Sequence, residues 1–198
     1  AAGLVVLLRR AGLAHRGGHV GHGERPAAEQ FFRKAIAGYE QQPRSAATLN
    51  NQGLACLNVY SLSSDPRDRA RGVELLQEAV ALAPGDSILL LNVSSVLLNE
   101  AVREQFGDVV RFDLTGGSPA LSDLYHLYDG EAQREVVMNK LRNSELMKRA
   151  LAHLEKTLLL APKNPAGYHL AHAAYSTFHD EARLIELRDR LKQAGLDH

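Results

Sequence analysis

Histidines are the residues of this chain whose type and spacing most directly suggest chemistry. Three of them, His15, His19 and His22, fall within the stretch HRGGHVGHGE at 15–24. Zinc takes three or four such ligands, usually from rigid elements. Four glycines lie among these histidines, and glycine at that density opposes a continuous helix. We therefore predict a flexible connector here and no metal site.

Two further groups of side chains could hold a metal or move protons. His169 and His172 are three residues apart in a helical pattern, which places them on one face. No Cys, Asp or Glu accompanies them locally, so we expect one to line a groove and the other to pack against a neighbouring helix. The second group is His126, Tyr125, Asp123 and Asp113. Nothing in the sequence fixes their geometry, and we expect no catalysis from them.

Composition excludes several classes of protein. The 198 residues include 23 Lys plus Arg and 23 Asp plus Glu, so the formal net charge is zero. A general nucleic-acid binder needs a basic excess to neutralise phosphates, and we expect no nucleic-acid partner. Cys56 is the single cysteine, which excludes an internal disulfide. No phosphate-loop, dinucleotide-binding, zinc-protease or serine-hydrolase motif appears. We predict a protein that is not an enzyme and uses no cofactor.

The apolar opening AAGLVVLL is shorter than the roughly 20 residues that span a bilayer. We expect it to be the buried face of a first helix, with the tail of a longer apolar segment as the alternative. No signal peptide is visible, and we expect no membrane span in this chain. The compartment stays undetermined, with the cytoplasm as the default.

Helical patterns dominate the chain. Apolar residues recur at helical spacing through 27–41, 70–83 and 145–160. The patterns are interrupted by QPRS at 42–45, SSDPRD at 63–68, APGDS at 83–87 and APKNP at 161–165. These interruptions predict turns, because Pro, Gly, Ser and Asp favour turn conformations.

Some of these breaks repeat one another. ALAPGDS at 81–87 resembles LLAPKNP at 159–165, and EQQPRSA at 40–46 is a weaker copy. When Pro43 is aligned on Pro84, LNNQGLACLN lies on LLNVSSVLLN. Self-similarity of this kind indicates a helical repeat architecture.

The repeat resembles the tetratricopeptide repeat, a helix–turn–helix unit of about 34 residues. One opening half reads Leu49-x2-Gln52-Gly53-x2-Cys56, and its closing half reads Gly72-x3-Leu76-x2-Ala79 before Pro84. Another closing half reads Ala150-x3-Leu154-x2-Thr157 before Pro162, and another opening half reads Tyr168-x2-Ala171-His172-x2-Tyr175. The resemblance implies an all-α fold, an α-solenoid of antiparallel helix pairs, with small residues where two helices touch.

We accordingly expect a single domain over 1–198. Its four helix pairs are 1–15 with 25–41, 46–60 with 67–83, 87–104 with 144–160, and 165–178 with 181–194. An insertion at about 105–143 separates the helices of the third pair. It is expected to be mixed, with a strand at 109–114, a turn at 115–119 and helices at 120–128 and 131–143. It is either an interaction element or a lid over exposed core, and the sequence leaves both open.

The resemblance also implies a binding site. In tetratricopeptide domains the first helix of each pair lines a concave groove, where an asparagine often grips the backbone of an extended peptide. Asn51 and Asn92 take that place here, and an amide can donate and accept at once. The other expected groove residues are Asn50, Leu54, Asn58, Leu91, Ser95, Asn99 and His169. No Lys or Arg stands among them, so an uncharged, partly apolar segment is expected in preference to an acidic tail.

The resulting hypothesis is a non-enzymatic interaction scaffold that binds a peptide segment or partner subunit in this groove. Self-association, or membership of a larger assembly, is a variant, because apolar solenoid ends stack unless they are capped. The segment AAGLVVLLRRAGLA is apolar nearly all round, whereas ARLIELRDRLKQAG is charged on one side. The rival hypothesis is a metal-binding or enzymatic protein that uses the insertion and the histidines, and a structural zinc would make its folding metal-dependent.

Overall fold

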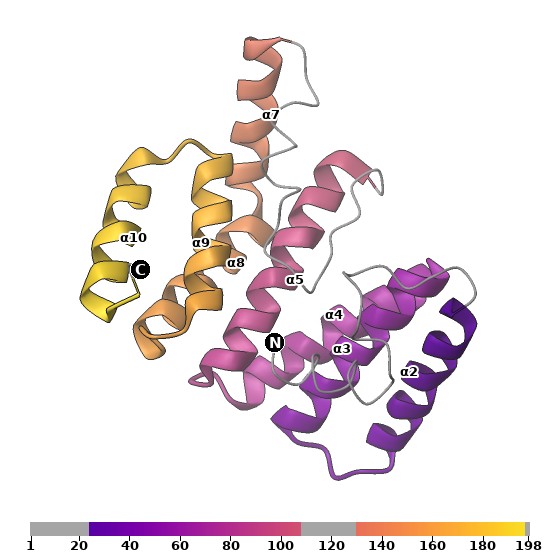
Figure 1. Cartoon of the computed structure of the whole chain (residues 1–198). Coiled ribbons are helices and arrows are strands. Elements are labelled where there is room, and N and C mark those ends of the chain that lie inside the picture. The colour runs from indigo at the N-terminus through magenta and orange to yellow at the C-terminus, as the bar shows by residue number, and fades with distance from the viewer. Residues whose placement is uncertain (1–23, 108–129, 197–198) are drawn as a thin grey trace. The chain divides into compact units, whose positions relative to one another are not determined.

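The computed structural model describes residues 24–107 and 130–196 (Figure 1). Within these ranges it has eight helices, and every regular element is a helix. The helices are α2 (Arg25–Glu40), α3 (Ala46–Ser63), α4 (Pro66–Leu82), α5 (Ser87–Phe106), α7 (Glu131–Asn143), α8 (Glu145–Leu160), α9 (Pro165–Thr177) and α10 (Glu181–Ala194). The all-helical class expected from the sequence is confirmed for the described residues.

The helix bounds agree with the sequence prediction to within one turn. The helix expected at 131–143 is α7, with the same bounds. α3 runs on to Ser63, and α5 runs on to Phe106, so α5 extends into the stretch assigned to the insertion. The expected helices at 1–15 and 120–128, and the expected strand at 109–114, lie outside the described residues.

Local sequence sets where the helices begin. A side-chain oxygen just before each of α3, α4, α8, α9 and α10 accepts a backbone N–H of the first turn. The capping residues are Ser45, Asp65, Ser144, Asn164 and Asp180. Proline stands in the first turn of α2, α4 and α9, where its missing N–H costs no hydrogen bond. The turns predicted at 42–45, 63–68 and 161–165 therefore supply the residues that cap the helices which follow them.

The contacts divide the chain into two compact units, Ala1–Leu89 and Leu90–His198. In the first unit α3 packs against both α2 and α4. In the second unit α9 packs against both α8 and α10, and α7 packs against α8. The hairpins α3–α4 and α9–α10 correspond to two of the expected helix pairs. The assembly of all pairs into one solenoid domain stays a prediction.

Two glycines form the crossing of α3 and α4. A Cβ atom placed on Gly53 would lie 3.0 Å from the carbonyl oxygen of Gly72 and 2.9 Å from Leu76 Cγ. A Cβ on Gly72 would lie 2.9 Å from the carbonyl oxygen of Gly53 and 2.7 Å from Leu57 Cγ. The two backbones are thus in contact, and the side chains of Leu57 and Leu76 close around the contact. This confirms, for this pair, the small residues expected where two helices touch.

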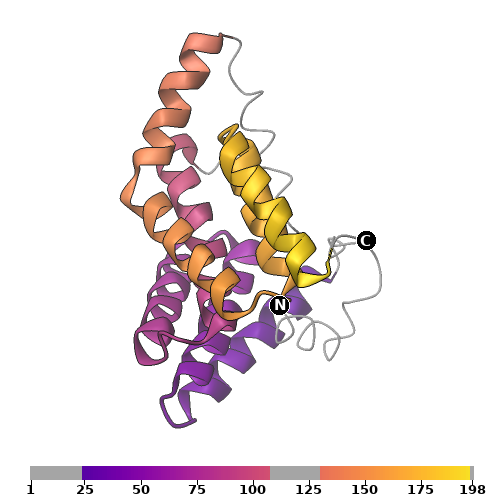
Figure 2. The same ribbon diagram turned by 90° about the vertical axis from the view of Figure 1, so that its left-hand side faces the viewer.

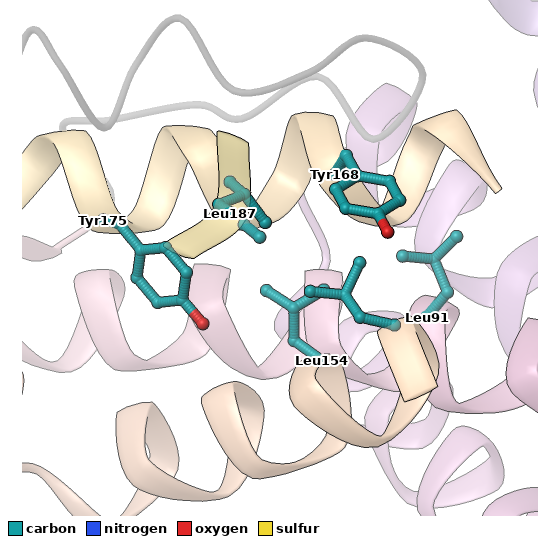
Figure 3. Packing of buried hydrophobic residues seen from close by; sticks show 7 residues of the cluster. Leu91, Leu154, Tyr168, Tyr175 and Leu187 are labelled. Carbon is teal, nitrogen blue, oxygen red and sulfur yellow. The ribbon is translucent and has the colours of Figure 1, made fainter. Parts of the chain in front are cut away.

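A cluster of apolar side chains holds the second unit together (Figure 3). Its buried members are Leu91, Leu154, Leu158, Tyr168, Ala171, Tyr175 and Leu187, drawn from α5, α8, α9 and α10. Gly167 allows α9 to approach α8, because a Cβ there would lie 3.2 Å from Leu158 Cδ2. That neighbour is a side-chain end, so this approach is less tight than the one between Gly53 and Gly72.

α7 and α8 are separated by a single residue, Ser144 (Figures 1 and 2). α7 buries only Met138 and Leu141, and Val136 on its outer side is 68% exposed. Its last turn nevertheless contacts the end of α9 within the same unit, because Arg142 Nη2 donates to the carbonyl oxygen of Phe178 at 2.6 Å. α7 is therefore anchored at its C-terminal end and largely exposed elsewhere.

The glycine contact predicts the outcome of three alanine substitutions. We expect Gly53→Ala and Gly72→Ala each to lower the free energy of unfolding by about 1–3 kcal/mol, since the methyl group meets a backbone carbonyl that no rotamer change can move. The control is Gly38→Ala in α2, where nothing lies within 4 Å of the added Cβ. There the better helix propensity of alanine should leave stability unchanged or raise it by up to about 1 kcal/mol.

Urea unfolding followed by circular dichroism measures all three variants. If Gly53→Ala or Gly72→Ala is as stable as Gly38→Ala, the two backbones are not in contact.

Candidate functional site

Charged residues are distributed unequally among the helices. α3, α9 and the Ser87–Asn99 part of α5 contain no Lys, Arg, Asp or Glu, whereas α2, α4, α7, α8 and α10 are rich in them. Each unit thus has an uncharged helix packed against two charged ones: α3 with α2 and α4, and α9 with α8 and α10. Of these uncharged segments, α3 and the Ser87–Asn99 part of α5 also carry side-chain amides, which can bind a ligand without a charged group.

Ion pairs join α2 to α4 across one side of α3. Arg33 Nη2 lies 3.3 Å from Asp68 Oδ2, and Arg71 donates to Glu40. Gln52 of α3, which is buried, also donates to Glu40 Oε1 at 3.5 Å. α2 and α4 therefore share the side of α3 that carries Gln52.

The side of α3 away from α2 and α4 has a different character. With about 3.6 residues per turn, it carries Ala47, Asn51, Leu54, Asn58 and Ser61, which we call the α3 face. Ala47 and Ser61 are exposed, Asn51 and Asn58 are partly exposed, and Leu54 is buried. The α3 face therefore presents two amides and no charged side chain of its own, and at its C-terminal end Arg25 of α2 donates to the Ser61 carbonyl at 3.4 Å.

Short-range hydrogen bonds orient these amides. Asn50, which is 7% exposed, donates from Nδ2 to Asn51 Oδ1 at 3.3 Å. Asn58 donates from Nδ2 to the carbonyl oxygen of Leu54 at 2.7 Å, one turn back along the helix. Asn51 thus uses its amide oxygen within α3, and Asn58 uses its amide nitrogen. Toward a ligand, Asn51 can offer an N–H donor and Asn58 an oxygen acceptor.

The remaining predicted groove residues belong to the second unit. Asn92, Ser95 and Asn99 are partly exposed, and their spacing places them on one face of α5. Leu91 is 8% exposed and packs in the apolar cluster of Figure 3, whereas His169 on α9 is exposed. A common groove with the α3 face stays a prediction, as does each residue's contact with a ligand.

The histidines differ in part from the expectation. His169 and His172 are both exposed, so neither packs against a neighbouring helix. Tyr168, Ala171 and Tyr175 are among the six buried residues of α9, and His172 follows Ala171 by about 100° around the helix. His172 Nδ1 instead lies 3.4 Å from Ser176 Oγ, one turn away on the same helix.

No metal site appears in the part of the chain that the structure describes, where no three His, Cys, Asp or Glu residues come together. The three histidines of the connector, and the group of His126, Tyr125, Asp123 and Asp113, lie outside that part. Cys56 is buried as expected, and desolvation raises the pKa of its thiol to about 11. A thiol that stays protonated near neutral pH is a packing residue and a poor nucleophile.

A polar contact among three helices was not anticipated from the sequence. Glu155 of α8 accepts a hydrogen bond from the Tyr175 hydroxyl of α9, and Arg190 Nη1 of α10 donates to Glu155 Oε2 at 2.9 Å. Burial alone would raise the pKa of Glu155, but the bonds from Tyr175 and Arg190 outweigh it and lower that pKa. Burial and the same bond raise the pKa of Tyr175. Partners 20 and 35 residues apart leave no signal in a local pattern.

Comparison with known proteins assigns no family. Family models, curated proteins and solved structures gave no match to the chain. The likeness to tetratricopeptide repeats therefore rests on the sequence pattern alone. Of the helices that the structure describes, none has the length and apolar character needed to cross a bilayer.

The contact at Glu155 predicts a pH dependence of stability. Since the pKa of Glu155 is lowered by folding, its ionised form adds stability above the ordinary glutamate pKa, and that stability is lost as the pH falls through the lowered value. We expect Glu155→Gln to melt below wild type at pH 7, with the difference shrinking below about pH 4.3. Melting temperatures by circular dichroism from neutral to acid pH measure the effect.

Glu135→Gln in α7 is the control, because the Glu135 side chain is exposed and lies beyond the first turn of its helix. A difference between wild type and Glu155→Gln that stays constant over the whole pH range contradicts the assignment.

Proposed function

We propose that the chain is a non-enzymatic protein-interaction module that binds a largely uncharged, partly apolar peptide segment along the α3 face. The observation that supports this is the segregation of charge around α3. The ion pairs Arg33–Asp68 and Arg71–Glu40 hold α2 and α4 on one side of an uncharged helix. The other side carries Asn51 and Asn58, whose amides suit a peptide backbone.

The chemistry of the α3 face defines the ligand. An extended segment brings unpaired backbone N–H and C=O groups, and side-chain amides can satisfy both kinds. Asn51 supplies a donor and Asn58 an acceptor, two turns apart on the same helix. A carboxylate on the ligand would lose its hydration beside Ala47 and Asn51 without meeting a cation of α3, which disfavours acidic segments over that part of the face.

The proposal extends to α5 and α9. Asn92, Ser95 and Asn99 repeat the polar, uncharged character on α5, and His169 contributes from α9. A partner subunit, or another copy of the chain, could supply the uncharged segment as well as a free peptide could.

Selection of binding peptides by the immobilised full-length protein tests the proposal. We expect a library of random peptides to yield sequences poor in Asp and Glu. Asn51→Ala should weaken their binding by roughly tenfold, because a buried hydrogen bond contributes about 1 kcal/mol and an unpaired group on the ligand costs about 1–3 kcal/mol. Asn92→Ala should weaken binding similarly if the site reaches α5.

The matched control is Asn139→Ala, an exposed asparagine on α7, which should bind as wild type does. Circular dichroism verifies the fold of each variant. Selection of acidic peptides, or equal binding by Asn51→Ala and Asn139→Ala, would exclude the α3 face as the site.

A further inference from the structure

The turn between α9 and α10 has an unusual residue at a strained position. It consists of Phe178, His179 and Asp180, and His179 has φ +49°. The N–H of Asp180 donates to the Tyr175 carbonyl at 3.0 Å, and the N–H of His179 donates to the Ser176 carbonyl at 3.1 Å. These two bonds define a Schellman motif, whose left-handed position is usually glycine.

The end of α10 shows the same motif with the usual residue. Gly195 has φ +70°, the N–H of Leu196 donates to the Leu191 carbonyl, and the N–H of Gly195 donates to the Lys192 carbonyl, both at 3.0 Å. Glycine adopts this conformation without a steric penalty, whereas a side chain at Cβ is penalised. The α9–α10 turn therefore stores backbone strain that the end of α10 does not.

The α9–α10 turn is also free to become helical. The turns that precede α3, α4, α5 and α9 contain a proline in the turn or at the first helical position, which prevents fusion of the helices they join. Of the described turns between consecutive helices, the α7–α8 turn at Ser144 and the α9–α10 turn have no glycine, and no proline in the turn or at the first helical position. Ser144 has φ −65°, so of these two only the α9–α10 turn would release strain on becoming helical. The α3–α4 turn also has a left-handed residue, Ser64, but Pro66 opposes its fusion.

The contacts that fasten α10 to its unit come from the helix and from Leu196 just beyond it, so they do not need the turn. Leu184, Leu191 and Leu196 are partly buried against the apolar cluster. Leu187 is the one buried side chain of α10, and it packs into the cluster shown in Figure 3. Arg190 pairs with Glu155, and the Arg183 guanidinium lies 5.3 Å from the centroid of the Tyr175 ring. An α10 from another copy of the chain can make every one of these contacts.

We propose that two copies of this chain exchange α10. In the exchanged dimer the residues Phe178–Asp180 are helical, α9 and α10 form one continuous helix, and each α10 lies against α8 and α9 of the other copy. The contacts of α10 with α8 and α9 are kept, and the strain at His179 is released. The bonds of the turn itself are lost: the two Schellman bonds, the Asp180 cap of α10 and the bond from Arg142 to Phe178. The second copy is favoured as the occupant because the site already fits α10 at Leu187, Arg190 and Arg183.

Arg142 of α7 stabilises the closed form, in which α9 and α10 of one copy stay separated by the turn. Arg142 donates to the Phe178 carbonyl at 2.6 Å, and its guanidinium lies 5.2 Å from the centroid of the Phe178 ring. In a continuous helix that carbonyl must accept the N–H of the residue four positions on, Ala182. The bond from Arg142 therefore competes with opening, which gives this part of the expected insertion a role in controlling exchange.

Complementary charge reversal tests the exchange directly. One full-length chain carries Glu155→Arg and the other carries Arg190→Glu, both with Glu186→Gln so that the neighbouring Glu186–Arg190 pair does not interfere. In a monomer of the first chain, positions 155 and 190 then carry two arginines, and in a monomer of the second chain they carry two glutamates. Like charges therefore meet within either monomer. In an exchanged heterodimer both contacts between these positions join opposite charges. Native mass spectrometry should show the heterodimer at least about tenfold above either homodimer. Monomers alone, or a statistical mixture of dimers, overturn the proposal.

Variants of the turn test the proposal without reversing a charge. His179→Gly should raise the dimer dissociation constant by roughly a hundredfold, about tenfold for each of the two turns. Arg142→Ala should lower it, and Lys140→Ala, an exposed change on the same helix, should leave it unchanged. Light scattering after size-exclusion chromatography over a range of concentrations measures the constant. Equal constants for wild type and His179→Gly, or monomers at every concentration, overturn the proposal.

Discussion

The contact between the backbones of Gly53 and Gly72 is the constraint on which the first unit depends. Because neither helix has a side chain at the crossing, α4 comes close enough to α3 for its charged residues to reach α2. Arg71 and Asp68 of α4 pair there with Glu40 and Arg33. A larger residue at the crossing would move α4 outward and separate these partners. The position of α4, and with it the separation between the charged and uncharged sides of α3, follows from two missing side chains.

In both units a similar set of hydrogen bonds joins three helices. In each, a glutamate of the first helix accepts hydrogen bonds from a polar residue of the middle helix and an arginine of the third. Glu40 does so with Gln52 and Arg71, and Glu155 with Tyr175 and Arg190. Exposed ion pairs contribute only about 0–1 kcal/mol each, so their main effect is on which helices are neighbours and in what register.

The two units differ in how firmly their third helix is held. α4 of the first unit meets α3 backbone to backbone and buries five residues, whereas α10 of the second buries only Leu187. Both helices follow a turn with a left-handed residue other than glycine, Ser64 before α4 and His179 before α10, but Pro66 begins α4 and no proline stands in the turn before α10 or at its start. Elements with few buried contacts open at lower free energy than the rest of a fold. This contrast fits a division of roles in which the first unit offers a fixed α3 face for a ligand and the second can exchange a helix.

For the residues that the structure describes, the sequence by itself determined the helical class, the helix bounds and the turns, because apolar periodicity, caps and prolines act over a few residues. It also marked Gly53 and Cys56 as packing positions. Only the tertiary structure decided which distant residues meet, as with the Glu155 contacts, since no local pattern selects one charged residue among many. It also placed both His169 and His172 outside the core, and it gave His179 a conformation in which glycine is expected. These features depend on where one helix lies against another, and that is set by the packing of the whole unit.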